Sequence, residues 1–316
     1  MILIYNVSKY NIYKYYIIED KNIKDMPLAI IIGFEYKKNT LPGTIIDIYH
    51  AYTWCKSFSC NTHIFTDIDH IKDIESINIA INKGIVTKDI LTFLKHFQFK
   101  SENMIKNKNV INTKEDFISK ICSAQGKFDN KLIIYYSGHG LDESIILPSG
   151  EHFLFKDFRD MIIQKLDKFV EIFWILDCCN PNGLYLPYKL TNNMFKLSST
   201  KIQCVTNPII LITSSEMNEK SIATGMGSIF TRNLFKYLTN MKNRNMQILV
   251  NSLRIEMNKI KTGYMQTVSI YTSYVIDPVL WMWIGQNKNY DIVSDLSLSM
   301  IVVRPANVIS NMKQLK

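Results

Sequence analysis

Short apolar runs rich in isoleucine alternate along this chain with longer stretches of helical period, and this alternation constrains the fold more than any other feature. The central runs KLIIYY, EIFWIL and PIILIT are apolar at successive positions, so each strand would be covered on both faces. Strands of this kind occur in parallel sheets that helices flank on both sides. Six runs are strand candidates: residues 28–34, 63–66, 131–136, 171–176, 208–213 and 268–275.

The alternation therefore predicts one α/β domain. We expect a three-layer sandwich, with a mostly parallel central sheet of about six strands and right-handed crossovers through helices on both faces.

Helix candidates fill the intervals between these runs. Thr44 precedes IIDIYHAYTWCKSF and Thr87 precedes KDILTFLKHF, each with an acid in the first turn. Thr113, followed three residues later by Asp116, resembles a capping box. Further helices are expected over 156–168, after Ser228, and over 246–260.

The chain of 316 residues is long enough to bury a sizeable core in one domain. We expect that domain over 27–284, with an N-terminal extension over 1–26 and a C-terminal tail over 285–316. Residues 184–207 form a long polar connection, and connections of that length in compact domains are usually functional or flexible.

Composition and hydropathy argue against a membrane protein. The chain is 47% hydrophobic and 21% charged, as globular proteins are. No apolar run approaches the roughly 18 residues that span a bilayer. The first residues, MILIYNVSKYNIYKYY, lack the unbroken apolar stretch of a signal peptide. We expect a cytoplasmic protein without a membrane partner.

The positive charge does not by itself indicate a nucleic-acid partner. The formal net charge is +9, but 32 of the 37 basic residues are lysines and they are scattered. Nucleic-acid readers cluster basic residues and use the arginine fork for phosphates and guanine. We interpret the charge as a solvated basic surface and expect no nucleic-acid partner.

The cysteines show no metal-binding spacing. They lie at positions 55, 60, 122, 178, 179 and 204, with no pair of CxxC units. Cys55, Cys60 and His63 would supply three zinc ligands, but no fourth ligand is near. We therefore interpret the two cysteines as reduced, buried thiols. No metal or other cofactor is expected.

Two segments carry residues of catalytic type. YYSGHG (135–140) and DCCNPNG (177–183) follow the third and fourth strand candidates, and α/β folds place their sites just past the carboxyl ends of strands. Adjacent parallel strands lie about 4.8 Å apart, which brings His139 within reach of Cys179. A thiol with a neighbouring imidazole becomes an efficient nucleophile at neutral pH.

The glycines around His139 suit the same chemistry. They permit a sharp turn, and the amides of Gly140 and Cys179 would stabilise a tetrahedral oxyanion. In the alternative interpretation, His139 only satisfies hydrogen bonds in a tight loop and Cys178–Cys179 fills the core. The occurrence of both residues at paired strand ends favours catalysis.

These motifs resemble the metacaspase branch of the caspase-like cysteine peptidases. YSGHG after an apolar strand and Asp-x-Cys after the next strand are the specific elements. PLAIIIGFEYKKNTLPGTIIDIYHAYTWCK, THIFTDID, PIILITSSEMNEKSIATGMGSIFTRNLFKYL and QTVSIYTSY resemble further segments of the family, in the same order. The resemblance covers about 27–284 and implies a caspase-like fold.

The resemblance also implies roles for individual residues. The family's nucleophile lies two positions after the Asp, which is Cys179, with His139 as the catalytic histidine. Asp47 and Asp177 match acids that line the first specificity pocket, and Ser137 matches a substrate-binding position beside them. The implied activity is an endopeptidase that cleaves peptide or protein substrates after Arg or Lys through a thioester.

Both acids also have a purely structural interpretation. Asp47 also fits a first-turn acid that interacts with the helix dipole, and Asp177 fits a turn-forming residue at a strand end.

The chain departs from the family's pattern in places. Asn180-Pro181-Asn182-Gly183 replaces the usual His-Ser-Gly, and Thr44 stands where the family's loop has a cysteine. The stretch LDESIILPSGE holds few acids, so we expect calcium-independent activity. A catalytically inactive caspase-like protein that regulates other proteins is the alternative.

Three further expectations follow. A thiol oxidoreductase that uses Cys178–Cys179 is a weaker hypothesis, because vicinal disulfides are strained. With a pocket for basic residues, self-cleavage in 184–207 is expected at Lys189, Lys196 or Lys201. The protein is expected to be a monomer.

Overall fold

The computed structural model describes residues 2–7, 12–17, 26–68, 74–98, 108–124, 131–181, 186–198, 206–240, 245–259 and 265–276, with the backbone alone for the first two ranges. The expected C-terminal tail, Cys204 and Lys201 lie outside these residues.

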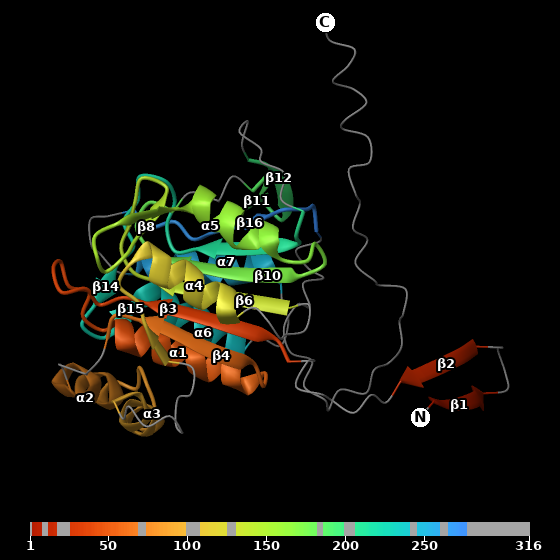
Figure 1. Ribbon diagram of the computed structural model, residues 1–316, viewed down its shortest axis with the longest axis horizontal. Helices are drawn as coiled ribbons and strands as arrows, with labels where there is room; N and C mark the ends of the chain where they lie inside the picture. The colour runs from red at the N-terminus through yellow and green to blue at the C-terminus, as the bar shows by residue number, and fades with distance from the viewer. Residues whose placement is uncertain are drawn as a thin grey trace, which may run out of the picture.

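A large, mostly parallel sheet forms the centre of the molecule, as the sequence predicted (Figure 1). The six expected strands are all present: β3 (Leu28–Gly33), β4 (Asn61–Thr66), β6 (Lys131–Ser137), β10 (Glu171–Asp177), β13 (Ile209–Thr213) and β16 (Ser269–Thr272).

Three further strands bring the described sheet to nine, so the expectation of about six was too low. These are β5 (Lys108–Val110), β11 (Tyr188–Thr191) and β12 (Met194–Leu197). The strand order is β12-β11-β16-β13-β10-β6-β3-β4-β5. Along this order, the six neighbouring strands β13, β10, β6, β3, β4 and β5 are parallel to one another. β16 pairs antiparallel with β13 and with β11, and β11 pairs antiparallel with β12.

Part of the predicted connection 184–207 is therefore regular structure. β11 and β12 form a hairpin that adds to the sheet beyond β16. Its turn residues, Asn192 and Asn193, both have left-handed backbone angles, which asparagine tolerates better than most residues.

The remaining described strands form three small sheets. β1 (Ile2–Val7) pairs with β2 (Ile12–Ile17), and β14 (Ala223–Thr224) pairs with β15 (Gly227–Ser228). The third sheet consists of β7 (Gly140–Leu141), β8 (Ser144–Ile146) and β9 (His152–Leu154).

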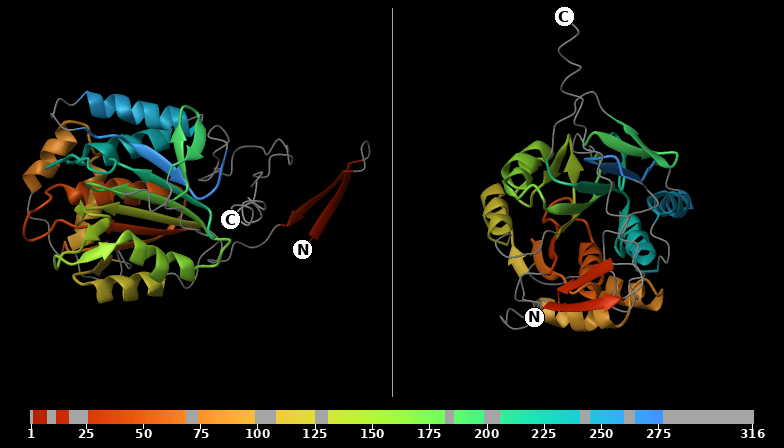
Figure 2. Two further views of the ribbon diagram at one scale, coloured as in Figure 1. Left: turned by 90° about the horizontal axis from the view of Figure 1, so that it is seen from above. Right: turned by 90° about the vertical axis from the view of Figure 1, so that its right-hand side faces the viewer.

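Helices cover both faces of the large sheet (Figure 2). They are α1 (Thr44–Ser57), α2 (Ile74–Asn82), α3 (Asp89–Gln98), α4 (Lys114–Ala124), α5 (Phe155–Met161), α6 (Ile229–Asn240) and α7 (Met246–Asn258). α1, α6 and α7 share one hydrophobic core with one face of the sheet, and α4 and α5 share a second core with the other face.

The alternation within each strand explains the two cores. In β3, Ala29 and Ile31 point into the core beneath α1, while Leu28, Ile30 and Ile32 point into the core beneath α4 and α5. All five side chains are at most 1% exposed. The uninterrupted apolar runs seen in the sequence are therefore strands covered on both faces.

The helix starts agree only partly with the sequence predictions. Asp116 donates its backbone N–H to Thr113 Oγ1 at 3.2 Å, which confirms that half of the capping box. Thr44 does not cap α1. It is the first helical residue after Gly43 and donates its hydroxyl to the carbonyl oxygens of Phe34 and Leu41. The helix expected over 156–168 is shorter, since α5 gives way to a 3₁₀ turn at Ile163–Lys165.

Candidate active site

The two segments of catalytic type lie at the carboxyl ends of neighbouring strands. β6 and β10 pair in parallel, with Ser137 opposite Asp177 at their ends. His139 and Cys179 each follow this pair by two residues, so both leave the sheet at the same edge. The strand order thus brings together the two loops that the sequence singled out.

Two tyrosines hold the backbone of His139. Its N–H donates to the hydroxyl of Tyr36 at 2.8 Å, and its carbonyl accepts from the hydroxyl of Tyr136 at 2.8 Å. The two tyrosine hydroxyls lie 3.1 Å apart, and Tyr36 also donates to the Ile146 carbonyl at 2.8 Å. The ring of Tyr36 packs on the imidazole with a centroid distance of 4.5 Å.

The loop that follows β3 supplies a partner for the imidazole. His139 Nε2 lies 2.6 Å from the carbonyl oxygen of Asn39. A carbonyl oxygen only accepts hydrogen bonds, so Nε2 carries the proton and Nδ1 of the neutral ring is left as a base. Asp67, at the end of β4, accepts the backbone N–H groups of Glu35 and Tyr36 at 2.8 Å each and anchors this loop.

The thiol of Cys179 contacts the backbone of Ser221. Ser221 donates its N–H to Cys179 Sγ at 3.3 Å, and the Ser221 carbonyl lies 3.8 Å from the same sulfur. No hydrogen bond joins the thiol to the imidazole of His139 in this arrangement of the two described side chains. Catalytic hydrogen bonds are often long in the absence of substrate.

The two adjacent cysteines have different environments. Cys178 is 1% exposed, and burial, reinforced by Asp177 and Cys179, raises the pKa of its thiol well above the ordinary value. Cys179 is partly exposed. A nucleophile must reach its substrate as a thiolate, so Cys179 is the better placed of the two.

Gly140 lies against this pair of cysteines. A methyl group built on Gly140 would come within 2.3 Å of the Cys179 carbonyl oxygen and within 2.8 Å of Cys178 Sγ. Only glycine permits the backbone of the histidine loop to approach the backbone of Cys179 so closely.

The two expected pocket acids, Asp47 and Asp177, lie close together beneath the loops that carry His139 and Cys179. They are 2% and 4% exposed, respectively. Burial raises the pKa of both carboxyls, and the neighbouring charge of Asp177 raises that of Asp47 further. Two buried carboxylates so arranged repel one another and favour a bound proton or a bound cation.

Hydroxyl groups and one amide satisfy these carboxylates. Asp47 accepts from Ser137 Oγ at 3.0 Å and from the Ser228 N–H at 2.8 Å. Asp177 accepts from Ser221 Oγ at 2.7 Å and from Thr231 Oγ1 at 2.6 Å.

Sequence reasoning missed three members of this group: Ser221, Ser228 and Thr231. They lie in the segment PIILITSSEMNEKSIATGMGSIFTRNLFKYL, which had been matched to the family only as a whole. The spacing of Ser228 and Thr231 across the start of α6 was the available signal, because Ser228 immediately precedes that helix and Thr231 lies in its first turn.

The segment that departs from the family's pattern is tied to the loop after β13. Asn180 adopts a left-handed backbone angle, donates its N–H to the Glu219 carbonyl at 2.9 Å and accepts from the Asn218 N–H at 2.7 Å. Pro181 is buried, while Asn182 and Gly183 lie outside the described residues.

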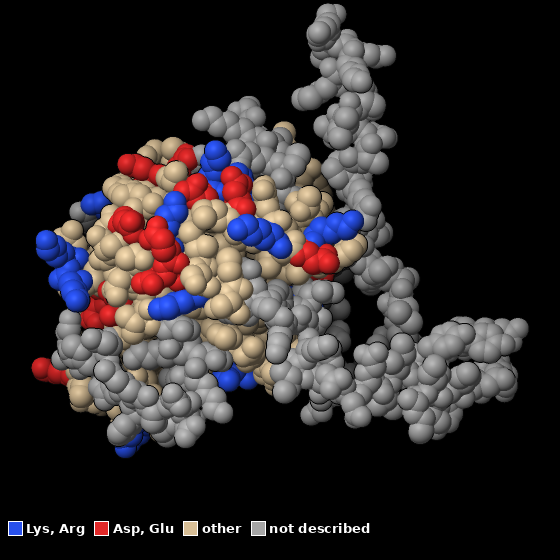
Figure 3. Space-filling model, in the orientation of Figure 1, with Lys and Arg blue, Asp and Glu red and all other residues tan. Residues whose placement is uncertain are grey.

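The remaining expectations are tested only in part. Among the described residues, no group of three or more His, Cys, Asp or Glu side chains is arranged to hold a metal ion, and none of the helices could cross a membrane. Basic and acidic side chains are interspersed on the face shown in Figure 3. Calcium independence, the monomeric state, the cytoplasmic location and the lack of a nucleic-acid partner stay predictions.

The architecture and the paired His and Cys loops define an α/β protein of the cysteine peptidase class. Comparison with known proteins agrees: the profile of the caspase domain matches residues 26–279. The chain therefore belongs to the caspase-domain family of cysteine peptidases, and its metacaspase subtype remains a proposal.

A solved structure shows the same fold at low sequence identity, and a second one is reported beside it for comparison. Protein GSU0716 from Geobacter sulfurreducens is 12% identical with a TM-score of 0.50, over 78% of this chain and 93% of that one. Caspase-1 from Spodoptera frugiperda is 11% identical with a TM-score of 0.44, over 79% of this chain and 86% of that one. No curated protein sequence matches this chain.

Proposed function

We propose that this protein is a metacaspase-type cysteine endopeptidase that cleaves after Arg or Lys. The observation that carries the proposal is the pair of buried acids, Asp47 and Asp177, beneath the loops of His139 and Cys179. Ser221 connects the proposed specificity pocket to the proposed nucleophile, because its hydroxyl donates to Asp177 while its backbone N–H donates to the sulfur of Cys179.

The proposed mechanism begins with proton transfer from the thiol. Because Nε2 of His139 is protonated toward Asn39, Nδ1 takes the proton of Cys179, once the sulfur turns from the Ser221 carbonyl toward the ring. The N–H of Ser221 stabilises the thiolate.

The thiolate then attacks the carbonyl carbon, and the oxyanion forms beside the backbone of Gly140. Nδ1–H of the imidazolium protonates the leaving amine as the C–N bond breaks, which leaves a thioester. Water, deprotonated by the same nitrogen, hydrolyses the thioester and restores the thiol.

The acids account for the proposed specificity. Burial makes it costly for both carboxyls to be ionised without a cation, so a guanidinium or ammonium group would displace the proton they retain. An acidic side chain would meet two carboxyls and be rejected.

Fluorogenic peptides that differ only in Arg, Lys or Asp before the scissile bond test this function. We expect cleavage of the first two, loss of it in Cys179→Ala, and retention in Cys178→Ala as the matched control. Mass spectrometry should find Cys179 labelled by a peptide inhibitor that ends in Arg. Cleavage after Asp, or equal activity of Cys179→Ala, would contradict the proposal.

A catalytically inactive regulator is the second candidate. The absence of a thiol–imidazole hydrogen bond and the altered loop at Asn180 and Pro181 favour it. The same assay separates the two, because an inactive protein would cleave no basic peptide and its cysteine would resist the inhibitor.

Self-cleavage in 184–207 rests on the proposed specificity. Lys189 lies in β11 between two paired strands, and its ammonium group binds Glu216 at 2.6 Å. A peptidase needs an extended segment with an accessible edge, and among the described strands β12 pairs on one side only, with β11, so we expect cleavage at Lys196 in preference to Lys189. Lys201 lies outside the described residues and stays a candidate. A single band of about 37 kDa, identical in wild type and Cys179→Ala, would show that no self-cleavage occurs.

A further inference from the structure

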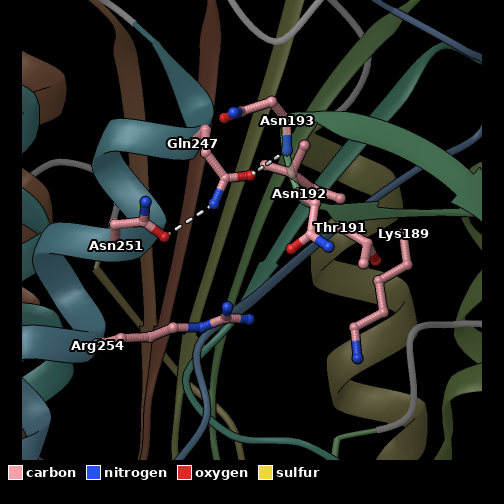
Figure 4. A pocket seen from close by; sticks show the side chains of 8 residues that line it. Lys189, Thr191, Asn192, Asn193, Gln247, Asn251 and Arg254 are labelled. Atoms are coloured by element: carbon pink, nitrogen blue, oxygen red, sulfur yellow. Dashed lines mark hydrogen bonds between the residues drawn. The ribbon is translucent and has the colours of Figure 1, made fainter.

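A cavity of about 400 Å³ lies between the turn of the β11–β12 hairpin and α7 (Figure 4). Residues 189–193 line it on the hairpin side, and Gln247, Asn251 and Arg254 line it on the helix side. The spacing of these three residues by four and three places them on one face of α7. The proposed peptidase mechanism uses none of them.

The cavity opens on the same edge of the sheet as the proposed active site. Thr213, at the carboxyl end of β13, pairs with Ser269 of the antiparallel β16, and Lys189 pairs with Tyr271 of that strand. The hairpin turn after β11 therefore points to the edge where β10 ends at Asp177. Three strand spacings separate β10 from β11, or about 14 Å.

The lining consists mainly of hydrogen-bond donors, and none of the eight residues that form it is acidic. Arg254 donates Nε to the Val268 carbonyl at 2.9 Å, which fixes its guanidinium group. Its two terminal nitrogens have no hydrogen-bond partner among the described residues. In Figure 4 the guanidinium of Arg254 points across the cavity toward the hairpin that carries Lys189.

The carboxylate of Glu216 lies behind the lining and neutralises part of the positive charge of Lys189 and Arg254. Lys189 binds Glu216 at 2.6 Å, and Glu216 also accepts from Ser269. Against the effect of burial, these two hydrogen bonds and the charges of Lys189 and Arg254 lower the pKa of Glu216. Glu216 is thus ionised at neutral pH and neutralises one of the two basic side chains of the lining. A second carboxylate, Glu219, accepts the backbone N–H of Glu216 at 2.9 Å and is held by the hydroxyl of Thr267, not by the lining.

The amide side chains are already oriented. Gln247 accepts the backbone N–H of Asn193 at 3.0 Å and donates to Asn251 Oδ1 at 2.8 Å. The oxygen of Asn251 is therefore occupied, and in Figure 4 its NH₂ group points away from Arg254. The fixed donor in the cavity is thus the guanidinium of Arg254, which binds an anion without further ordering of its side chain.

From this geometry we propose that the cavity binds an oxyanion, a carboxylate or phosphate group, on the guanidinium of Arg254, with Asn251 on the same face of α7 and Lys189 opposite. An arginine fork matches the oxygens of such a group. The group comes either from an acidic side chain of a bound protein segment or from a free anion. The proposal does not depend on peptidase activity.

Calorimetric titration of the full chain carrying Cys179→Ala tests it, since no cleavage then interferes. The titrants are inorganic phosphate and a hexaglutamate peptide. We expect at least one to bind, with an affinity that falls as salt is added. Arg254→Gln should weaken binding about tenfold or more.

Two further variants make the result specific to the cavity. Asn251→Asp keeps the acceptor for Gln247 but places a negative charge in the cavity, and it should also weaken binding at least about tenfold. Lys236→Gln, an exposed position on α6 outside the cavity, removes the same charge as Arg254→Gln and should leave binding unchanged.

The outcomes separate the sources of the anion. Binding of hexaglutamate alone, or of both titrants, supports an acidic protein segment, and binding of phosphate alone supports a free anion. Binding of neither, or equal losses in Lys236→Gln and Arg254→Gln, would overturn the proposal. If Arg254→Gln lowers the melting temperature, its loss of binding no longer reports on the cavity alone. The binding measured for Asn251→Asp, at an exposed position, then decides whether the proposal holds.

Discussion

His139 Nε2 lies 2.6 Å from the carbonyl oxygen of Asn39, and this single contact sets the tautomer of the imidazole. Asn39 is in a loop with left-handed backbone angles at both Tyr36 and Asn39, and Asp67 anchors that loop. The orientation of the proposed general base is therefore decided by β3 and β4, as well as by the strand that carries the histidine.

Tyr36 is a positioning residue for His139, and Tyr36→Phe tests this role. The variant leaves the His139 N–H without its acceptor, a loss of about 1–3 kcal/mol for a buried donor. We expect kcat to fall about tenfold with KM little changed, and the acidic limb of the pH–rate profile to shift.

Tyr52→Phe is the matched control, because the Tyr52 hydroxyl makes no hydrogen bond among the described residues. An unchanged pH profile in Tyr36→Phe, whatever its stability, would refute the positioning role.

Gly140→Ala should inactivate the protein. The added methyl group would lie 2.3 Å from the Cys179 carbonyl oxygen, so one of the two catalytic loops must move. Gly225→Ala is the control, since its methyl group meets nothing closer than Ser76 Oγ at 3.4 Å. We expect peptidase activity to fall at least about 100-fold in the first variant, because a displacement of about 1 Å costs that much. Equal activity of the two variants would show that the close approach has no catalytic role.

The pocket acids should make substrate binding depend on pH. Burial raises the pKa of Asp177 and, together with the charge of Asp177, that of Asp47. As pH rises through these raised pKa values the carboxyls lose their proton, so KM for an Arg peptide should fall.

Asp177→Asn should raise KM for Arg and Lys peptides about tenfold or more and weaken its dependence on pH. A variant that alters kcat alone would place Asp177 outside the specificity pocket.

His50 should make the fold sensitive to acid. Burial, aided by Arg232, lowers its pKa to about 4, and its Nε2 is buried without a partner among the described residues. Because the unfolded form binds a proton near pH 6.5 and the folded form resists it, stability is complete above about pH 6.5 and falls toward pH 4.

A shift of this size corresponds to about 3 kcal/mol. Urea unfolding at pH 7 and pH 4.5 should show a smaller loss in His50→Gln than in wild type, with His96→Gln as the control. The same loss in all three proteins would exclude His50 as the cause.

The hairpin β11–β12 shows where sequence reasoning reached its limit in the fold. The central strands were evident because their residues are apolar on both faces, and each lies where it was expected. The hairpin adds two strands at the edge of the sheet, where β12 buries only Phe195 and exposes Met194 and Leu197. Such a strand has no continuous apolar run, so its pairing depends on the neighbour that the tertiary fold supplies.

For the candidate site, the sequence by itself determined which strands carry His139 and Cys179, because a motif and the strand before it are formed by neighbouring residues. The acids Asp47 and Asp177 were indicated only by the resemblance to the family. Only the tertiary structure decided that Asn39 offers its carbonyl to His139, and that Ser228 reaches Asp47 across 181 positions of the chain. A backbone group has the same chemistry at every residue, so its role depends on where the fold places it.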